Sequence, residues 1–246
     1  GKLLSKSIAA LIALSYENKK QGDIAKASKL QPGEDSRILN RMIELDIIAQ
    51  NGAFYRFTDR MFRFWLKSVY IKRIASFSLD EGAEESVFKK DIANRFGVFS
   101  NEFEKDLSSR IMELFNLFKN DIIQLNGKKH KFISFTSVEK IEDNAKNQTS
   151  VIATSGRQKW LFTIKKENVT ENDMQEIIKN AREQKKSSGI TRNIVIAFSG
   201  VNENAYLMAK EARFWTWNLE DLNVLMELYS KPHISEDTTC GNQRFP

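Results

Sequence analysis

Three side chains suited to nucleic-acid contact fall close together in the sequence: Arg37, Asn40 and Arg41. A guanidinium can donate two parallel hydrogen bonds to a phosphate or to guanine, and the amide of asparagine matches the edge of adenine. Lys29 and Arg56, on either side in the sequence, could hold the phosphate backbone. These five residues predict a surface that contacts DNA or RNA, provided that the fold brings them to one face.

The elements that would position these residues follow one another in an informative order. Helical patterns are expected over residues 23–28 and 35–45, with Pro32-Gly33 breaking the chain between them. Asn51-Gly52 then lies between two apolar runs, which predicts a hairpin with a type I′ turn. Helix, turn, helix and hairpin is the order of a winged helix, in which the second helix enters the major groove.

The distribution of charge agrees with this interpretation. Residues 1–76 carry 14 Lys and Arg against 7 Asp and Glu, a net charge of +7, whereas residues 77–246 carry 24 against 25. The basic excess therefore lies in the first third of the chain, as expected if that part binds a polyanion and releases its condensed counterions.

Composition excludes several other classes of protein. Cys240 is the only cysteine, and His130 and His233 are the only histidines, so neither a disulfide framework nor a structural zinc site is expected. The apolar stretch over residues 7–14 has the pattern of a signal peptide but is too short to span a membrane. We interpret it as a first helix and expect a cytoplasmic protein with no membrane contact.

The remainder of the chain has an α/β pattern. A helix over residues 101–119 should be followed by three strands, a crossover helix and a further strand, which is the core order of a nuclease-like fold. A second helix and strand come next, and Asn218 with Asp221 should cap a last helix. The strands are expected at 131–135, 149–154, 159–166, 193–198 and 214–217, and the helices between them at 171–184 and 203–211.

Three motifs carry a resemblance to a known family: Tyr-Arg-Phe-Thr-Asp at 55–59, Phe-Arg-Phe-Trp-Leu at 62–66 and the segment 214–223. They resemble the C-terminal half of archaeal-type AAA+ (STAND-like) ATPases. In that family a P-loop domain is followed by a winged helix and by a domain of poorly known function that resembles the PD-(D/E)XK nuclease fold. No Gly-x-x-x-x-Gly-Lys-Ser/Thr occurs in this sequence, so ATP binding of that kind is not expected.

The resemblance implies a two-domain α/β (α+β) fold. The N-terminal part would be a winged helix-turn-helix, and the C-terminal part a restriction-endonuclease-like mixed sheet flanked by helices. The expected division is a winged-helix domain with an aromatic linker helix over 1–76, a helical connector over 77–99, the nuclease-like domain over 100–234 and a disordered tail over 235–246.

The resemblance also implies where a nuclease would hold its metal. Active members of that fold carry an Asp on the second core strand and Glu-x-Lys on the third, because hard cations need carboxylate oxygens. At these positions the chain has Ser150 and Thr163-Ile164-Lys165, so only the lysine is retained. We expect the site to be degenerate. The alternative is a relocated site built from Glu104, Asp143 and Glu167.

Three functions follow. The first is a noncatalytic DNA-binding and regulatory portion of an AAA+ type ATPase, with double-stranded DNA and its own upstream ATPase domain, or another copy of the chain, as partners. The second is a metal-dependent DNA nuclease, the only case in which Mg²⁺ would be a cofactor. The third is a protein-interaction module. Metal-dependent cleavage separates the second from the others, and salt-sensitive DNA binding separates the first from the third.

Overall fold

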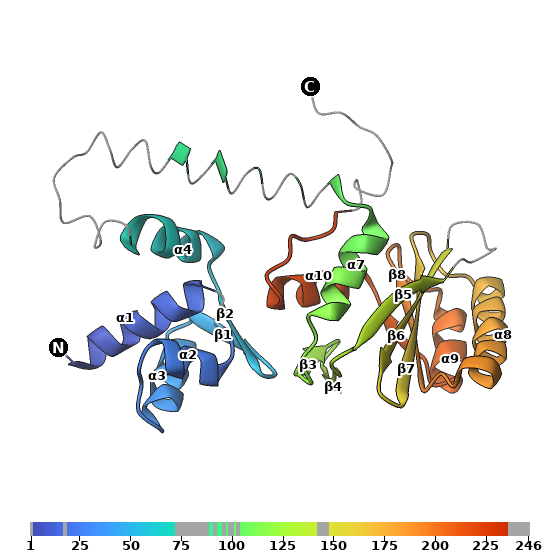
Figure 1. The fold of residues 1–246 in the computed structure, drawn as a ribbon, viewed down its shortest axis with the longest axis horizontal. Helices are drawn as coiled ribbons and strands as arrows, with labels where there is room; N and C mark the ends of the chain where they lie inside the picture. Colours follow the sequence, from blue (N-terminus) through green and yellow to red (C-terminus); the bar gives the residue numbers. More distant parts are fainter. Residues whose placement is uncertain are drawn as a thin grey trace. The chain divides into compact units, whose positions relative to one another are not determined.

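A computed structural model describes residues 2–16, 19–71, 89–90, 93–94, 97, 101, 104–141 and 148–235 (Figure 1). Over these residues the chain has a mixed α/β fold. It divides into two compact units, one formed by Gly1–Ser100 with Ile122–His130 and the other by Asn101–Asp121 with Lys131–Pro246. Residues 122–130, expected in the second domain, thus group with the first unit.

The first unit begins with three helices and a hairpin. In chain order these are α1 (Lys2–Ser15), α2 (Gln21–Ala27), α3 (Glu34–Glu44), β1 (Ile48–Asn51), β2 (Phe54–Phe57), α4 (Arg60–Trp65) and the π-helical turn η1 (Leu66–Tyr70). One face of α3 is buried through Ile38, Leu39 and Met42, in a cluster with Leu14 and Ile24 of the preceding helices. The predicted order of helices and hairpin is therefore present.

The ends of α3 are fixed by local backbone geometry. Gly33 precedes it with a φ of 84°, and the side chain of Asp35 accepts a hydrogen bond from the Gly33 amide at 3.1 Å. At the other end Asp46 has a φ of 54°, and the amide of Ile47 donates to Met42 O at 3.0 Å. This closing pattern satisfies carbonyls that a helix end leaves unpaired, so α3 ends sharply after Glu44.

The predicted type I′ turn at Asn51-Gly52 is wrong by one residue. Asn51 pairs with Phe54, so the turn is formed by Gly52 and Ala53. Of these two only Gly52 has a positive φ, 57°, which is the arrangement of a type II′ turn. Asn51 is held in the strand because its side chain bonds to another segment, the β3–β4 hairpin.

The type I′ turn occurs at a second Asn-Gly pair. Asn126 and Gly127 have φ values of 48° and 73°, and they join β3 (Ile122–Leu125) to β4 (Lys128–Lys131). The strand predicted over 131–135 is therefore wrong. Strand β4 ends at Lys131, and residues 132–135, which include the buried Phe132 and Phe135, are not in a strand.

The second unit is built on a five-stranded mixed sheet in the order β5-β6-β7-β8-β9. The first three strands are antiparallel, and β7, β8 and β9 are parallel. The strands are β5 (Ser137–Ile141), β6 (Gln148–Ser155), β7 (Gln158–Lys165), β8 (Arg192–Ala197) and β9 (Trp215–Trp217). The four expected strands after residue 148 are confirmed, whereas β5 lies after the segment predicted as a strand.

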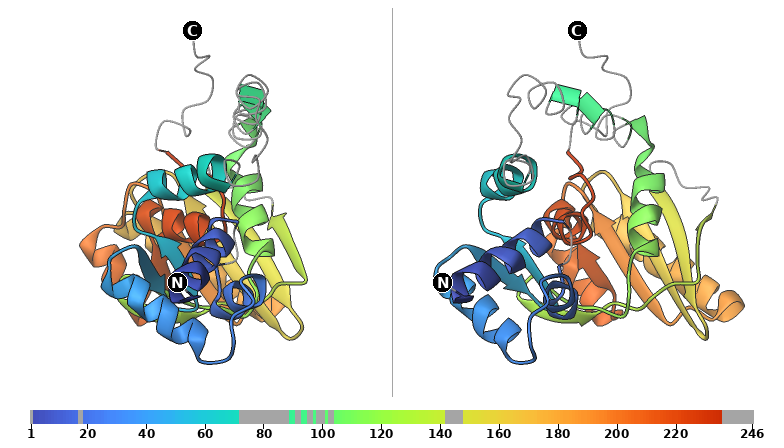
Figure 2. Two further views of the ribbon diagram at one scale, coloured as in Figure 1. Left: turned by 90° about the vertical axis from the view of Figure 1, so that its left-hand side faces the viewer. Right: turned by 60° about the vertical axis from the view of Figure 1, so that its left-hand side comes forward.

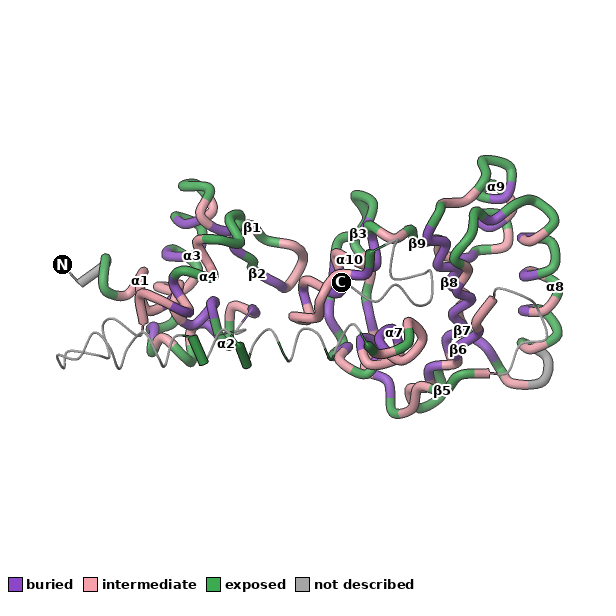
Figure 3. The backbone as a smooth tube through the Cα atoms, turned by 90° about the horizontal axis from the view of Figure 1, so that it is seen from above, coloured by how far each residue is buried: buried purple, intermediate pink, exposed green. Residues whose placement is uncertain are grey.

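Helices cover both faces of this sheet (Figure 2). They are α7 (Leu107–Asn116), α8 (Glu171–Ser188), α9 (Glu203–Glu211) and α10 (Leu219–Leu228). Helices α8 and α9 pack on the face that includes Leu161 and Val195. Phe115 of α7 stacks on Phe162 with a centroid distance of 4.0 Å, on the opposite face. Buried positions accordingly concentrate along β6, β7 and β8 (Figure 3).

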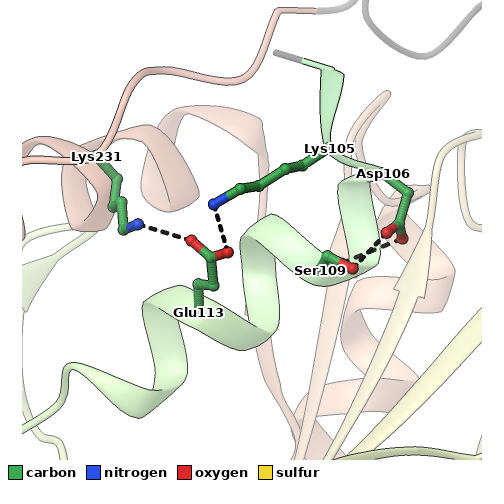
Figure 4. Close-up of polar contacts among 5 residues, drawn as sticks. All are labelled: Lys105, Asp106, Ser109, Glu113 and Lys231. Atoms are coloured by element: carbon green, nitrogen blue, oxygen red, sulfur yellow. Dashed lines mark hydrogen bonds and ion pairs between the residues drawn. The ribbon is translucent and has the colours of Figure 1, made fainter. Parts of the chain in front are cut away.

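Helix α7 begins at Leu107, later than the predicted start at residue 101, because Asp106 caps it. The Asp106 carboxylate accepts a hydrogen bond from the Ser109 amide at 3.2 Å, as in an N-cap, and also bonds the Ser109 hydroxyl. Glu113 then accepts from Lys105 at 2.6 Å and from Lys231 at 2.7 Å (Figure 4). These two hydrogen bonds lower the pKa of Glu113 and attach α7 to the segment after α10.

The ends of the last helices agree with local capping rules. Asn218 and Asp221 form the predicted capping box, with hydrogen bonds of 2.8 and 3.1 Å between side chain and backbone.

Within the described ranges no helix combines the length and the apolar character needed to cross a membrane.

Candidate nucleic-acid interface

The outer face of α3 brings together three of the five predicted contact residues. Arg37, Asn40 and Arg41 are exposed, and together with Ser7 of α1 they line an open hollow of about 670 Å³. The buried stripe of the same helix points the other way, so the core fixes which face is presented. Two guanidinium groups and an amide can here donate hydrogen bonds side by side to one ligand.

Two acidic residues at the start of α3 form hydrogen bonds with other helices of the first unit. Glu34 accepts from Lys6 of α1 at 2.6 Å, and Asp35 accepts from Gln21 of α2 at 2.8 Å. The hydrogen bond from Lys6, followed by that from the Gln31 amide, lowers the pKa of Glu34. These carboxylates would repel a phosphate if they faced the solvent unpaired. Their hydrogen bonds instead attach α3 to the other two helices.

Arg41 has a competing partner within its own helix. Its guanidinium lies 3.0 Å from the Glu44 carboxylate, and about two thirds of each side chain is exposed. An exposed pair of this kind contributes less than about 1 kcal/mol. A phosphate can therefore displace Glu44 at small cost, and Arg41 remains available for binding.

The other two predicted residues do not line this hollow. Lys29 lies just after α2 with a φ of 52°, and Arg56 is an outward-facing residue of β2. Both side chains are exposed. The structure thus groups the three α3 residues and leaves Lys29 and Arg56 as separate cations on the same unit.

The tip of the β1–β2 hairpin is docked on the β3–β4 hairpin. Asn51 donates from its side-chain amide to Gln124 O at 3.1 Å and accepts from Gln124 N at 2.8 Å. The Ala53 amide donates to Ile122 O at 3.0 Å. Sequence reasoning missed this hairpin and with it Lys128 and Lys129, although Asn126-Gly127 carries the same turn signal as Asn51-Gly52.

The residues matched to the nuclease motif also come together. Ser150 of β6 and Thr163 of β7 are direct partners across the antiparallel pair, and Lys165 follows two residues later on the same face. Ser150 and Thr163 are each 3% exposed. Two neutral hydroxyls buried beneath α8 lack both the charge to retain Mg²⁺ and the access that a nucleic-acid substrate requires, so these residues do not fit the metal.

Lys165 has a carboxylate partner that sequence reasoning missed. Its ammonium nitrogen lies 2.5 Å from Asp173 Oδ1, and its side chain is 11% exposed. Asp173 also accepts from the Thr170 amide at 2.8 Å as part of the capping box of α8. The Thr170-x-x-Asp173 spacing is the sequence signal that could have indicated it. Lys165 therefore anchors the start of α8 to the end of β7.

The alternative carboxylates do not assemble into a metal site in the described structure. Glu104 and Glu167 are exposed, and Asp143 lies outside the described residues. Among the residues that the structure describes, no group of three or more His, Cys, Asp and Glu side chains could hold a metal ion.

The Lys165–Asp173 pair predicts a specific dependence of stability on pH. Burial opposes ionisation of Asp173, but hydrogen bonds from Lys165 and Thr170 outweigh it and lower its pKa to about 2. The ordinary value for Asp is about 3.9. Because the pKa of Asp173 is lower in the folded state, its ionised carboxylate stabilises the fold at pH values above the ordinary pKa. This contribution to stability is lost as the pH falls toward 2. We expect Asp173→Asn to lower the melting temperature by roughly 3 °C at pH 7.

Thermal unfolding from pH 7 to pH 2 measures this effect. The difference in melting temperature between the wild type and Asp173→Asn should shrink below about pH 4 as the carboxylate becomes protonated. Glu176→Gln, an exposed position of the same helix, is the matched control and should leave the melting temperature unchanged. A difference that stayed constant down to pH 2 would show that the ion pair does not stabilise the fold.

Comparisons with known proteins add little to this geometry. No family model matches the chain, and no curated protein matches it. Among solved structures, the crystal structure of protein VC1899 from Vibrio cholerae is similar, with 9% sequence identity and a TM-score of 0.31. That similarity covers 94% of this chain and 56% of the other, so the chain spans a little over half of that protein's length. A TM-score this low carries no argument about fold or function.

Proposed function

We propose that this chain binds double-stranded DNA through the exposed face of α3, with the first unit acting as a winged helix. The grouping of Arg37, Asn40 and Arg41 around one open hollow is the observation that carries the proposal. Their spacing follows one face of a helix, and such a helix presents its side chains to the major groove in DNA-binding proteins with this element order. The guanidinium groups would bind phosphates, and Asn40 could meet a base edge.

The second unit would be a noncatalytic, nuclease-like domain. Its helix, its three antiparallel strands β5–β7, the crossover helix α8 and the parallel strand β8 follow the order expected for the PD-(D/E)XK fold. Support for the absence of cleavage comes from Ser150 and Thr163, buried where carboxylates would be needed, and from the engagement of Lys165 with Asp173. The resemblance to AAA+ ATPases would make the chain their regulatory C-terminal portion, acting with an ATPase domain located upstream or with another copy.

A salt series tests the DNA-binding proposal. Fluorescence anisotropy of a labelled random-sequence duplex is measured with the full chain between about 50 and 200 mM salt, where each phosphate contact contributes a slope near −0.9. We expect the logarithm of the binding constant to fall steeply with the logarithm of the salt concentration, with a slope of about −3 or more negative. Absence of binding at the lowest salt, or binding that is insensitive to salt, would overturn the proposal.

Glu44 provides a prediction of increased affinity. Glu44→Gln removes the carboxylate that pairs with Arg41 at 3.0 Å and removes a negative charge from the rim of the hollow. Duplex affinity should rise by about threefold at low salt, since an exposed pair costs less than about 1 kcal/mol to break. Glu176→Gln in the second unit has the same chemistry and should leave affinity unchanged. Equal effects of the two variants, or a fall in affinity at Glu44→Gln, would contradict the placement of DNA on α3.

A further inference from the structure

The β3–β4 hairpin carries a concentrated positive charge. Its second strand reads Lys128-Lys129-His130-Lys131, and residues 122–131 contain no Asp or Glu. The side chains of Lys128 and Lys129 are exposed, and both residues belong to the first unit. This is a cationic strand on the unit that also contains α3.

The hairpin is held firmly on the first unit. The side chain of Asn51 bonds both the amide and the carbonyl of Gln124, in the manner of a neighbouring strand, and Ala53 N donates to Ile122 O. A Cβ atom at Gly52 would lie 2.0 Å from the Ile122 oxygen, so only glycine allows the two backbones to approach this closely. The β3–β4 hairpin, which carries the β4 lysines, is therefore fixed in position against the β1–β2 hairpin.

The shape of the hairpin suits a nucleic-acid groove. A two-stranded ribbon is narrow enough to enter the major groove of a duplex. Successive side chains of a strand point to opposite faces, so Lys128 and Lys129 extend from different faces of the ribbon. Ile123 and Leu125 of β3 are buried, so one face of the ribbon is covered, but Lys128 and Lys129 are both exposed and could reach phosphates from the solvent side.

We propose that the β3–β4 hairpin is a second DNA-binding element, in which Lys128 and Lys129 bind phosphates of the duplex held by α3. The proposal rests on the proposed function and extends it. The β3–β4 hairpin covers the turn at Gly52 of the β1–β2 hairpin. Lys128 and Lys129 of the covering hairpin, and not residues of the covered turn, would therefore contact the DNA. Its contacts are to the phosphate backbone, because lysine is a point charge without the paired donors that read a base edge.

The salt dependence of binding tests this element separately from α3. Lys128→Gln with Lys129→Gln should reduce the magnitude of the log–log salt slope by about two and weaken duplex binding by about tenfold near 0.1 M salt. The control, Lys179→Gln with Lys210→Gln, removes two exposed lysines from α8 and α9 and should leave the slope unchanged. An unchanged slope in the β4 variant, with wild-type binding intact, would refute this inference and leave the α3 proposal standing.

A second variant tests whether docking matters. Asn51→Ala removes both hydrogen bonds to Gln124 while leaving the exposed lysines in place. If the hairpin acts from its docked position, Asn51→Ala should weaken duplex binding by about threefold, and the β4 lysine variants should lose less affinity in that background. Fully additive effects would show that the lysines act without the docked arrangement and would overturn this part of the inference.

Discussion

Gly52→Ala is expected to cause the largest loss of stability of any single substitution discussed for this chain. The new methyl group would lie 2.0 Å from the Ile122 oxygen and 2.8 Å from its carbonyl carbon, and both are backbone atoms that cannot rotate away. The residue also has a φ of 57°, which costs an L-amino acid about 1 kcal/mol. We expect the free energy of unfolding of the first unit to fall by about 3 kcal/mol.

Urea unfolding followed by hydrogen exchange of backbone amides measures this loss in the first unit. Gly156→Ala is the matched control, because Gly156 is also a hairpin residue with a positive φ, 55°, but a Cβ there would meet nothing within 4 Å. The control, measured in the same way in the second unit to which Gly156 belongs, should lose only about 1 kcal/mol, from backbone strain. Equal losses in the two variants would mean that the close approach of the two hairpins does not exist in solution.

Reversing the charge of Arg37 and Arg41 is expected to cause the largest loss of DNA binding. Both side chains are exposed on the face of α3 that lines the hollow, so Arg37→Glu with Arg41→Glu should leave the fold intact. Each reversal removes a phosphate contact and adds a repelling charge. Affinity for a random duplex should fall by at least about 100-fold at low salt.

Arg157→Glu with Arg182→Glu is the matched control for this variant. It makes the same change in net charge at two exposed arginines of the second unit. The control should lose less than about threefold, because it changes the net charge without removing a cation from the exposed face of α3. A comparable loss in both double variants would mean that net charge and not α3 determines binding.

The elements that depend on local sequence were predictable, and those that depend on distant partners were not. The stripe of Ile38, Leu39 and Met42 has helical spacing, so the orientation of α3 followed from the sequence. The turn at Asn51-Gly52 was misplaced because the conformation of Asn51 depends on Gln124, which is far away in the sequence. No local pattern contains that information.

The second unit shows the same contrast. Ser150 lies opposite Thr163 because β6 and β7 pair across the turn at Gly156 and Arg157. The two strands were predicted from the sequence, but their register was not. The pairing of Lys165 with Asp173 was missed because it joins a strand end to a helix start across a loop. The capping spacing that locates Asp173 at the first turn of α8 is local, however, and would have sufficed to name it as a candidate.

The most direct test of the central claim is to determine which residue lies against bound duplex DNA. A photoreactive benzophenone amino acid replaces Asn40, which is exposed on α3, or Tyr206, which is 44% exposed on α9. After irradiation with a labelled duplex, the account predicts a protein–DNA cross-link from position 40 that disappears at high salt, and none from position 206. Cross-linking from position 206 but not from position 40 would contradict the assignment of the DNA interface to α3.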